Sequence, residues 1–264
     1  MRKPRMRESN PIETVSEWIA QSRRIIVFTG AGVSTESGIP DFRSAGGLWD
    51  RYDPDEFRFR RFLESEEARR KYWKMHTEIY ELFTKVRPNV AHEACVELDR
   101  LEKLECVITQ NVDNLHTEAG LPPGKVIEIH GNALQVGCLE CDARHTRAEV
   151  QGWLEAGEEV PLCRKCGGLL KPRTISFGQG MPIEEMQEAE VRMKRCDLFI
   201  VIGSSLVVYP AADMPVHARV NGARLVIINM TPTPFDEQAD LVIYGKAGKA
   251  MGEILERVKQ ILVN

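Results

Sequence analysis

Four of the seven cysteines stand in two Cys-x-x-Cys pairs, Cys138 with Cys141 and Cys163 with Cys166, and 21 residues separate the pairs. Two such pairs supply four thiolates, which is the ligand set of a tetrahedral structural zinc site. Four protein ligands leave no open coordination position, so we predict that this zinc ion does not activate water. The alternative is a redox role, which we disfavour because neither pair follows a strand in the manner of a thioredoxin motif.

A glycine-rich segment, VFTGAGVSTESGIPDFR at 27–43, directly follows an apolar run. Glycines after a strand let backbone amides approach a pyrophosphate closely, and Gly30 and Gly32 stand at that place. Five residues separate Gly32 from the next glycine, Gly38, so the usual dinucleotide motif, which has two, is not met. The residues alone leave two interpretations open, a phosphate-binding loop and a turn that binds no ligand.

Two further segments carry groups that can act on a sugar or an amide. Gln110, Asn111 and Asp113 can bond to sugar hydroxyls, although Asn and Asp also favour capping turns. His130 follows a short apolar run, and a neutral imidazole can take a proton from a hydroxyl group near neutral pH. The alternative for His130 is a hydrogen-bonded structural histidine. The other five histidines are assigned structural or surface roles: His76, His92, His116, His145 and His217.

Five short apolar runs predict the strands of a parallel sheet, because they are continuous and rich in β-branched residues. They cover 24–30, 106–111, 198–205, 225–229 and 241–245. Helices are predicted at 11–22, 88–103, 183–195 and 248–262. This alternation is typical of the α/β class, and we predict a Rossmann-like, doubly wound parallel sheet. The polar residues that end the runs would then meet in one crevice, beyond the carboxyl ends of the strands.

Two stretches interrupt this alternation. Residues 44–85 are charged and helical in character, and residues 134–172 contain the cysteine pairs. We predict that both are insertions, a helical one and a zinc-binding module, which together form a smaller lobe over the crevice. The Rossmann-like, NAD-binding domain would then comprise 1–43, 86–133 and 173–264.

The composition limits the partners of the chain. Its 264 residues carry a net charge of −4, which argues against direct nucleic-acid binding. No apolar run approaches the roughly 20 residues that span a bilayer, and no signal-peptide core follows the basic start. We therefore expect a cytoplasmic protein without a membrane partner.

Eight ordered motifs resemble those of the sirtuins, the NAD-dependent protein-lysine deacylases, of archaeal and bacterial type. They are GAGVSTESGIPDFR (30–43), TQNVDNLH (109–116), IHG (129–131), the two cysteine pairs, ISFGQGMP (175–182), GSSLVVYPA (203–211), IIN (227–229) and GKAG (245–248). The resemblance covers about residues 12–262. It implies an enzyme that releases nicotinamide from NAD and transfers the acyl group of an acylated-lysine protein substrate to ADP-ribose. NAD is then a co-substrate that is consumed.

The resemblance also implies roles for single residues. His130 would be the general base, and Asn111 would position a water molecule or a ribose hydroxyl, so both would be catalytic. The residues implied to bind NAD are Gly30, Ala31, Gly32, Ser34, Ile39, Asp41, Phe42, Arg43, Gln110, Asn111, Asp113, Gly203, Ser204, Ser205, Asn229, Lys246 and Ala247. Those implied to bind the acyl-lysine substrate are Ile175, Phe177, Gly178 and Val207.

Two details bear on the acyl group. Sirtuins that prefer succinyl or malonyl groups carry Tyr-x-x-Arg in the helical insertion, and none of the five tyrosines here is followed by Arg at that spacing. We therefore expect acetyl or longer neutral acyl groups, which the sequence does not rank. Gln179 stands where the family commonly has Glu, and the sequence does not indicate the effect of this difference.

Two other functions stay open. An ADP-ribosyltransferase or NAD-cleaving enzyme would use the same pocket and differ only in the acceptor. A non-catalytic, NAD-sensing binding module would need no histidine at position 130. The presence of both Asn111 and His130 favours deacylation.

Overall fold

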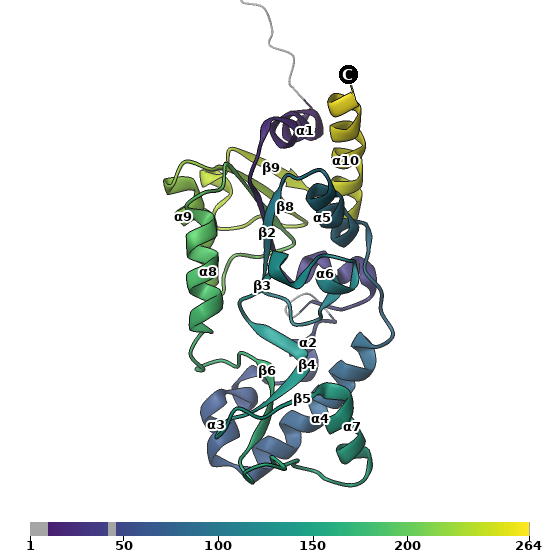
Figure 1. Cartoon of the computed structure of the whole chain (residues 1–264), viewed down its shortest axis with the longest axis vertical. Coiled ribbons are helices and arrows are strands. Elements are labelled where there is room, and N and C mark those ends of the chain that lie inside the picture. The colour runs from purple at the N-terminus through teal and green to yellow at the C-terminus, as the bar shows by residue number, and fades with distance from the viewer. Residues whose placement is uncertain (1–9, 42–45, 264) are drawn as a thin grey trace, which may run out of the picture.

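The computed structural model describes residues 10–41 and 46–263, and their largest element is a six-stranded parallel sheet (Figure 1). The strands are β1 (Ile25–Thr29), β2 (Leu104–Thr109), β3 (Val126–Glu128), β7 (Leu198–Ile202), β8 (Arg224–Asn229) and β9 (Leu241–Tyr244). Their order is β3-β2-β1-β7-β8-β9, and all neighbouring pairs are parallel. The order reverses between β1 and β7, as in a doubly wound fold. The predicted Rossmann-like sheet is confirmed.

Helices cover both faces of this sheet, which explains why its central strands are apolar without alternation. On one face α1 (Pro11–Gln21), α5 (Val90–Arg100) and α10 (Ala247–Val263) pack in one hydrophobic core. On the other face α8 (Ile183–Met193) and α9 (Met214–Val220) form a second core with the same strands (Figure 1). Every residue of β1 and β7 is buried as a result.

A smaller three-stranded antiparallel sheet lies beyond the parallel one, in the order β5-β4-β6. Its strands are β4 (Gly131–Cys138), β5 (Arg144–Thr146) and β6 (Leu170–Thr174). The helices α2 (Leu48–Arg51), α3 (Phe59–Glu64), α4 (Glu66–Phe83) and α7 (Arg147–Glu155) accompany it (Figure 1). Trp73 of α4 packs with Val136, Val150 and Leu170 in one cluster, so the two insertions share a core.

The structure differs from the sequence prediction in a few elements. The strand β3, the helix α9 and the four-residue helix α6 (Leu115–Glu118) were not predicted. The strands β1 and β7 end before the glycines that the predicted runs included, so Gly30 and Gly203 lie in loops. The predicted boundaries at 133/134 and 172/173 fall inside β4 and β6, and the division of the chain into two lobes stays a prediction. None of the helices described is long and apolar enough to cross a membrane.

Candidate active site and metal centre

A cavity of about 710 Å³ lies at the carboxyl ends of β1, β2, β7 and β8 and is also lined by residues of α4 and of the segment after β6. A doubly wound sheet places its ligand site there, where the strand order reverses. Most of the predicted site residues line this cavity: Gly30, Ala31, Gly32, Asp41, Gln110, Asn111, His130, Ile175, Phe177, Gly178, Gly203, Ser204, Ser205, Asn229 and Ala247. Segments from the whole length of the chain therefore meet at one site.

Five other predicted residues that the structure describes do not line the cavity. Ser34 and Asp113 are buried, and Ile39 and Lys246 lie outside the lining. Val207 is 45% exposed, and its neighbour Val208 lines the cavity instead. Phe42 and Arg43 fall outside the residues that the structure describes.

The glycine loop packs directly on the backbone that follows β7. Gly32 donates its N–H to the carbonyl oxygen of Gly203 at 2.8 Å. A Cβ atom added to Gly32 would lie 2.8 Å from the Cα of Gly203, closer than side chains approach. Gly203 has a φ of +63°, in the left-handed region that favours glycine. The loop therefore presents backbone to the cavity, as a phosphate-binding loop requires.

A buried hydroxyl joins the glycine loop to the segment after β2. Ser34 Oγ donates to Asp113 Oδ2 at 2.7 Å and accepts from Asn111 Nδ2 at 3.1 Å. Burial raises the pKa of Asp113 above its ordinary value, and the bonds from Leu115, Ser34 and Asn111 partly offset this rise. Ser34 and Asp113, which do not line the cavity, thus hold the amide of Asn111, which does line it.

Two histidines that the sequence left as structural lie behind the site, one beside the Ser34 hydroxyl and the other beside the Thr29 hydroxyl. His92 Nε2 is 3.4 Å from Ser34 Oγ, and His116 Nε2 is 3.0 Å from Thr29 Oγ1. Their ring centroids are 4.8 Å apart, and burial lowers the pKa of both, that of His92 to about 4. Both rings are therefore neutral and serve as hydrogen-bond partners behind the site, which no spacing in the sequence indicates.

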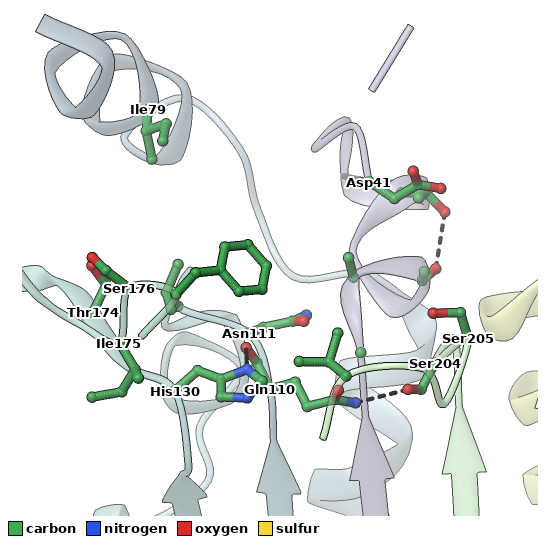
Figure 2. A pocket seen from close by; sticks show the side chains of 18 of the residues that line it. Asp41, Ile79, Gln110, Asn111, His130, Thr174, Ile175, Ser176, Ser204 and Ser205 are labelled. Atoms are coloured by element: carbon green, nitrogen blue, oxygen red, sulfur yellow. Dashed lines mark hydrogen bonds between the residues drawn. The ribbon is translucent and has the colours of Figure 1, made fainter. Parts of the chain in front are cut away.

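His130 lies in the middle of the cavity and has a defined tautomer (Figure 2). Its Nδ1 is 3.0 Å from the carbonyl oxygen of Gln110. A carbonyl oxygen only accepts, so Nδ1 carries the hydrogen and the Nε2 lone pair is left to take a proton. Burial lowers the pKa of His130 below its ordinary value, partly offset by this bond, so the ring is neutral at neutral pH.

Gln110 also links the His130 side of the cavity to the loop after β7. Its Nε2 donates to Ser204 Oγ at 2.8 Å, and Figure 2 shows this bond spanning the floor of the cavity. Ser204 is buried, whereas Ser205 is exposed. Two of the polar strand ends that the sequence placed in one crevice, those after β2 and β7, are thus directly bonded to each other.

The opposite end of the cavity is formed by the segment after β6 and by α4. Ile175 donates its N–H to the carbonyl oxygen of His130 at 2.9 Å, which fixes this segment against the histidine. Ile79 of α4 lies above Ile175 in Figure 2. Further lining residues here that the sequence did not indicate are Phe57, Tyr72, Met75, His76, Thr174 and Ser176. This end is mostly apolar, and burial lowers the pKa of His76 well below its usual value, so its ring is neutral.

The turn at 176–179 gives Gln179 a structural role. Its Oε1 accepts the backbone N–H of Ser176 at 3.1 Å, and its own N–H bonds to the Ser176 carbonyl oxygen at 2.9 Å. A Glu carboxylate could accept the same N–H, so Gln keeps the turn and removes a negative charge from the cavity wall.

The four predicted zinc ligands lie together. Their Sγ atoms are all within 4.8 Å of one another, with Cys138 and Cys166 at 3.6 Å and Cys141 and Cys163 at 3.7 Å. Tetrahedral Zn–S bonds of about 2.3 Å place sulfurs roughly 3.8 Å apart, so the four residues fit zinc. The backbone N–H groups of Glu140 and Gly168 donate to the sulfurs of Cys138 and Cys166, which stabilises and orients thiolate ligands.

Comparisons with known proteins agree on one family. The model of the Sir2 family matches residues 30–210. An "NAD-dependent protein deacetylase" of Rhodopseudomonas palustris is 44% identical over 244 residues, 92% of this chain and 96% of the relative. An "NAD-dependent protein deacylase 2" of Archaeoglobus fulgidus is 42% identical over 95% of this chain and 97% of the relative.

Solved structures give the same result. The structure of a Sir2 enzyme matches with a TM-score of 0.84 and 41% sequence identity. The match covers 95% of this chain and 98% of the other chain. A Sir2 structure with a p53 peptide and NAD+ has a TM-score of 0.85 and 35% identity, with 97% of this chain and 100% of the other covered. The fold class, with a parallel sheet and a four-cysteine module, is confirmed. The chain belongs to the Sir2 family.

Proposed function

We propose that this chain is an NAD-dependent protein-lysine deacylase, which releases nicotinamide from NAD and transfers the acyl group to ADP-ribose. The observation that carries this proposal is the place of His130. It lies between the loops that end β1 and β7 on one side and the Ile175 segment on the other (Figure 2). One base can therefore serve a ribose and an acyl-lysine that enter the same cavity.

The chemistry asks for a neutral base, and His130 meets that need. Its Nε2 lone pair would take a proton from a ribose hydroxyl, because Nδ1 is held by Gln110. The Asn111 amide, fixed by Ser34, would hold a water molecule or a ribose hydroxyl. Both residues reach the cavity and would act as the catalytic pair.

The NAD contacts follow the strand ends. Ala31, Gly32 and Ser34 would lie near the phosphates, where the glycine loop offers backbone amides, while the Ser34 hydroxyl holds Asp113 and Asn111. Ile39, Asp41, Phe42 and Arg43 would lie near the nicotinamide half, with Gln110 and Asp113 near the ribose or carboxamide. Ser204, Ser205, Asn229, Lys246 and Ala247 would hold the adenosine side.

The acyl-lysine would enter beside Ile175, Phe177, Gly178 and Val207. The part of the cavity lining that the structure describes holds no Lys or Arg. The Lys171 ammonium is buried behind this wall and donates to the carbonyl oxygen of Thr174, so a distal carboxylate would meet no cation in the lining itself. An apolar wall without a cation suits a neutral acyl group, because a desolvated carboxylate is costly without a partner. Acetyl and longer neutral acyl groups are therefore the proposed substrates.

Acylated-lysine proteins are the partners in this proposal. A related Sir2 structure holds a p53 peptide together with NAD+, which supports a protein substrate for this chain. The closed set of four cysteines would hold one zinc ion that stabilises the small lobe and takes no part in the reaction. A cytoplasmic location stays a prediction.

His130→Ala tests the proposed role directly. We expect the variant to bind NAD and to lose deacylation of an acetyl-lysine peptide, because the site keeps its contacts and loses its base. His217, in the middle of α9, is exposed, and His217→Ala is the matched control, which should keep both NAD binding and deacylation. Deacylation by His130→Ala at the wild-type rate would reject the assigned base, and NAD binding without any turnover in the wild type would favour the binding module.

A further inference from the structure

Three side chains form a hydrogen-bonded chain directly behind the His130 turn. Asn132 Nδ2 donates to Glu128 Oε1 at 2.7 Å and to Asn114 Oδ1 at 3.1 Å. Asn132 Oδ1 accepts the backbone N–H of Leu134 at 2.8 Å. Asn132 is 4% exposed, so its amide has both hydrogens and its oxygen engaged inside the protein. A buried amide with every group paired holds its neighbours in one arrangement.

The ends of this chain are attached to the two segments that carry the proposed catalytic groups. Asn114 closes the segment that bears Asn111, and its backbone is left-handed, with a φ of +67°. Glu128 and Asn132 stand two residues before and two residues after His130. The Asn132 amide therefore bridges the Asn111 segment and the His130 turn.

Backbone contacts already join the same two segments at other points. Ala133 donates its N–H to the carbonyl oxygen of Val112 at 2.9 Å, and Ile129 donates to that of Thr109 at 3.1 Å. With the bond from His130 to Gln110, they make a ladder along the segments. The side-chain bond from Asn132 to Asn114 extends this ladder beyond Val112, the last residue of the segment that these backbone bonds reach.

We propose that Glu128, Asn132 and Asn114 are positioning residues, which hold His130 and Asn111 at the separation that lets both act on one ribose. This inference rests on the proposed deacylase function. None of the three lines the cavity, so they act through the groups they hold. In the proposed reaction, His130 takes a proton during acyl transfer, after nicotinamide has left, and takes no part in the cleavage of nicotinamide. Loss of the bridge should therefore slow acyl transfer more than cleavage.

The charge of Glu128 gives the bridge a pH dependence. Burial raises the pKa of Glu128 to about 7, with the Asn132 bond opposing this rise. Asp113 from the loop after β2 and Glu185 of α8 add to the rise, while Arg173 of β6 opposes it. An ionised carboxylate accepts a stronger hydrogen bond than a neutral acid. The bridge is thus strongest above about pH 7, where Glu128 is ionised. As the pH falls below 7, Glu128 takes up a proton and the bridge weakens while His130, whose pKa is lowered, is still neutral.

The test compares deacylation of an acetyl-lysine peptide with exchange of labelled nicotinamide into NAD, which reports only cleavage and its reversal. Asn132→Ala should lower kcat for deacylation about tenfold and change exchange by less than about twofold. Glu128→Gln keeps an acceptor oxygen, so its deacylation rate should stay near that of the wild type. The plot of its deacylation rate against pH should lose the step near pH 7 and should fall only at acidic pH. Asn221→Ala, exposed after α9, is the matched control.

Asn114→Gly covers the case in which Asn132→Ala does not fold. Glycine adopts a positive φ without strain, so this variant removes the acceptor and leaves the backbone in place. Its ratio of deacylation to exchange should fall about threefold. The inference would be overturned if Asn114→Gly and folded Asn132→Ala kept the wild-type ratio of deacylation to nicotinamide exchange, and if Glu128→Gln kept the wild-type dependence of the deacylation rate on pH. Absence of deacylation in the wild type would instead reject the proposed function.

Discussion

Ser34→Ala should destabilise the protein and lower its activity, because a single hydroxyl pairs two buried groups. Ser34 Oγ donates to Asp113 at 2.7 Å and accepts from Asn111 at 3.1 Å. Alanine leaves a carboxylate oxygen and an amide hydrogen buried without these partners, and each loss costs about 1–3 kcal/mol. We expect the free energy of unfolding to fall by about 2–4 kcal/mol.

The size of this loss depends on pH through Asp113. The pKa of Asp113 is raised above 3.8 in the folded protein, and the Ser34 bond is one of the contacts that hold it down. With a raised carboxyl pKa the folded state keeps its proton while the unfolded chain releases it, so stability falls as pH rises from 3.8 to the folded pKa. Ser34→Ala raises that pKa further, so it costs more stability at pH 8 than at pH 4.

Urea unfolding followed by circular dichroism at both pH values measures this difference. The rate of NAD-dependent deacylation, which we expect to fall at least about tenfold because Asn111 loses its anchor, is measured at pH 8. Thr117→Ala, half-buried on α6, is the matched control. An unchanged urea midpoint and an unchanged kcat in Ser34→Ala would refute the reasoning about the buried hydroxyl.

Three other perturbations give separate outcomes. Removal of the metal by a chelator should unfold the small lobe and lower the melting temperature, and full activity in a zinc-free sample would contradict a structural zinc. Gly131→Ala should destabilise by about 3 kcal/mol or more, because Gly131 has a φ of +77° and a Cβ would lie 1.7 Å from the Arg173 carbonyl oxygen. Gly137→Ala on the same strand meets only the Arg173 side chain, and equal melting temperatures of the two variants would count against the backbone clash. A succinyl-lysine peptide should show a kcat/KM at least about 100-fold below that of an acetyl-lysine peptide, because the described lining has no cation, and comparable values would reject the neutral-acyl assignment.

The sequence predicted best what is encoded in contiguous residues. The central strands are continuous apolar runs because both faces of the sheet are covered, and the zinc ligands follow a fixed spacing. The strand β3 was missed because it has only three residues and ends at Glu128. Its short run gives no periodicity that would separate a strand from a loop.

Contacts between distant residues were not accessible in the same way. His92 and Ser34 are 58 positions apart, and a single sequence holds no sign that they meet. The residues of α4 that line the cavity include Tyr72, Met75, His76 and Ile79, at the spacing of any apolar helix face. Such a stripe predicts burial but does not distinguish a core from a cavity wall. The sequence predicted Val207 at the site, whereas the structure has Val208 in the cavity lining. The conformation of the loop decides which of the two neighbours faces the cavity, and the sequence does not show this conformation.

Mass spectrometry of an acetyl-lysine peptide, incubated with the pure protein with and without NAD, tests the central claim most directly. We expect the acetyl mass to be lost only when NAD is present, together with release of nicotinamide and formation of O-acetyl-ADP-ribose. Nicotinamide release from a peptide that keeps its acyl group, across acetyl and longer neutral acyl peptides, would contradict the account and favour ADP-ribosyl transfer or NAD cleavage.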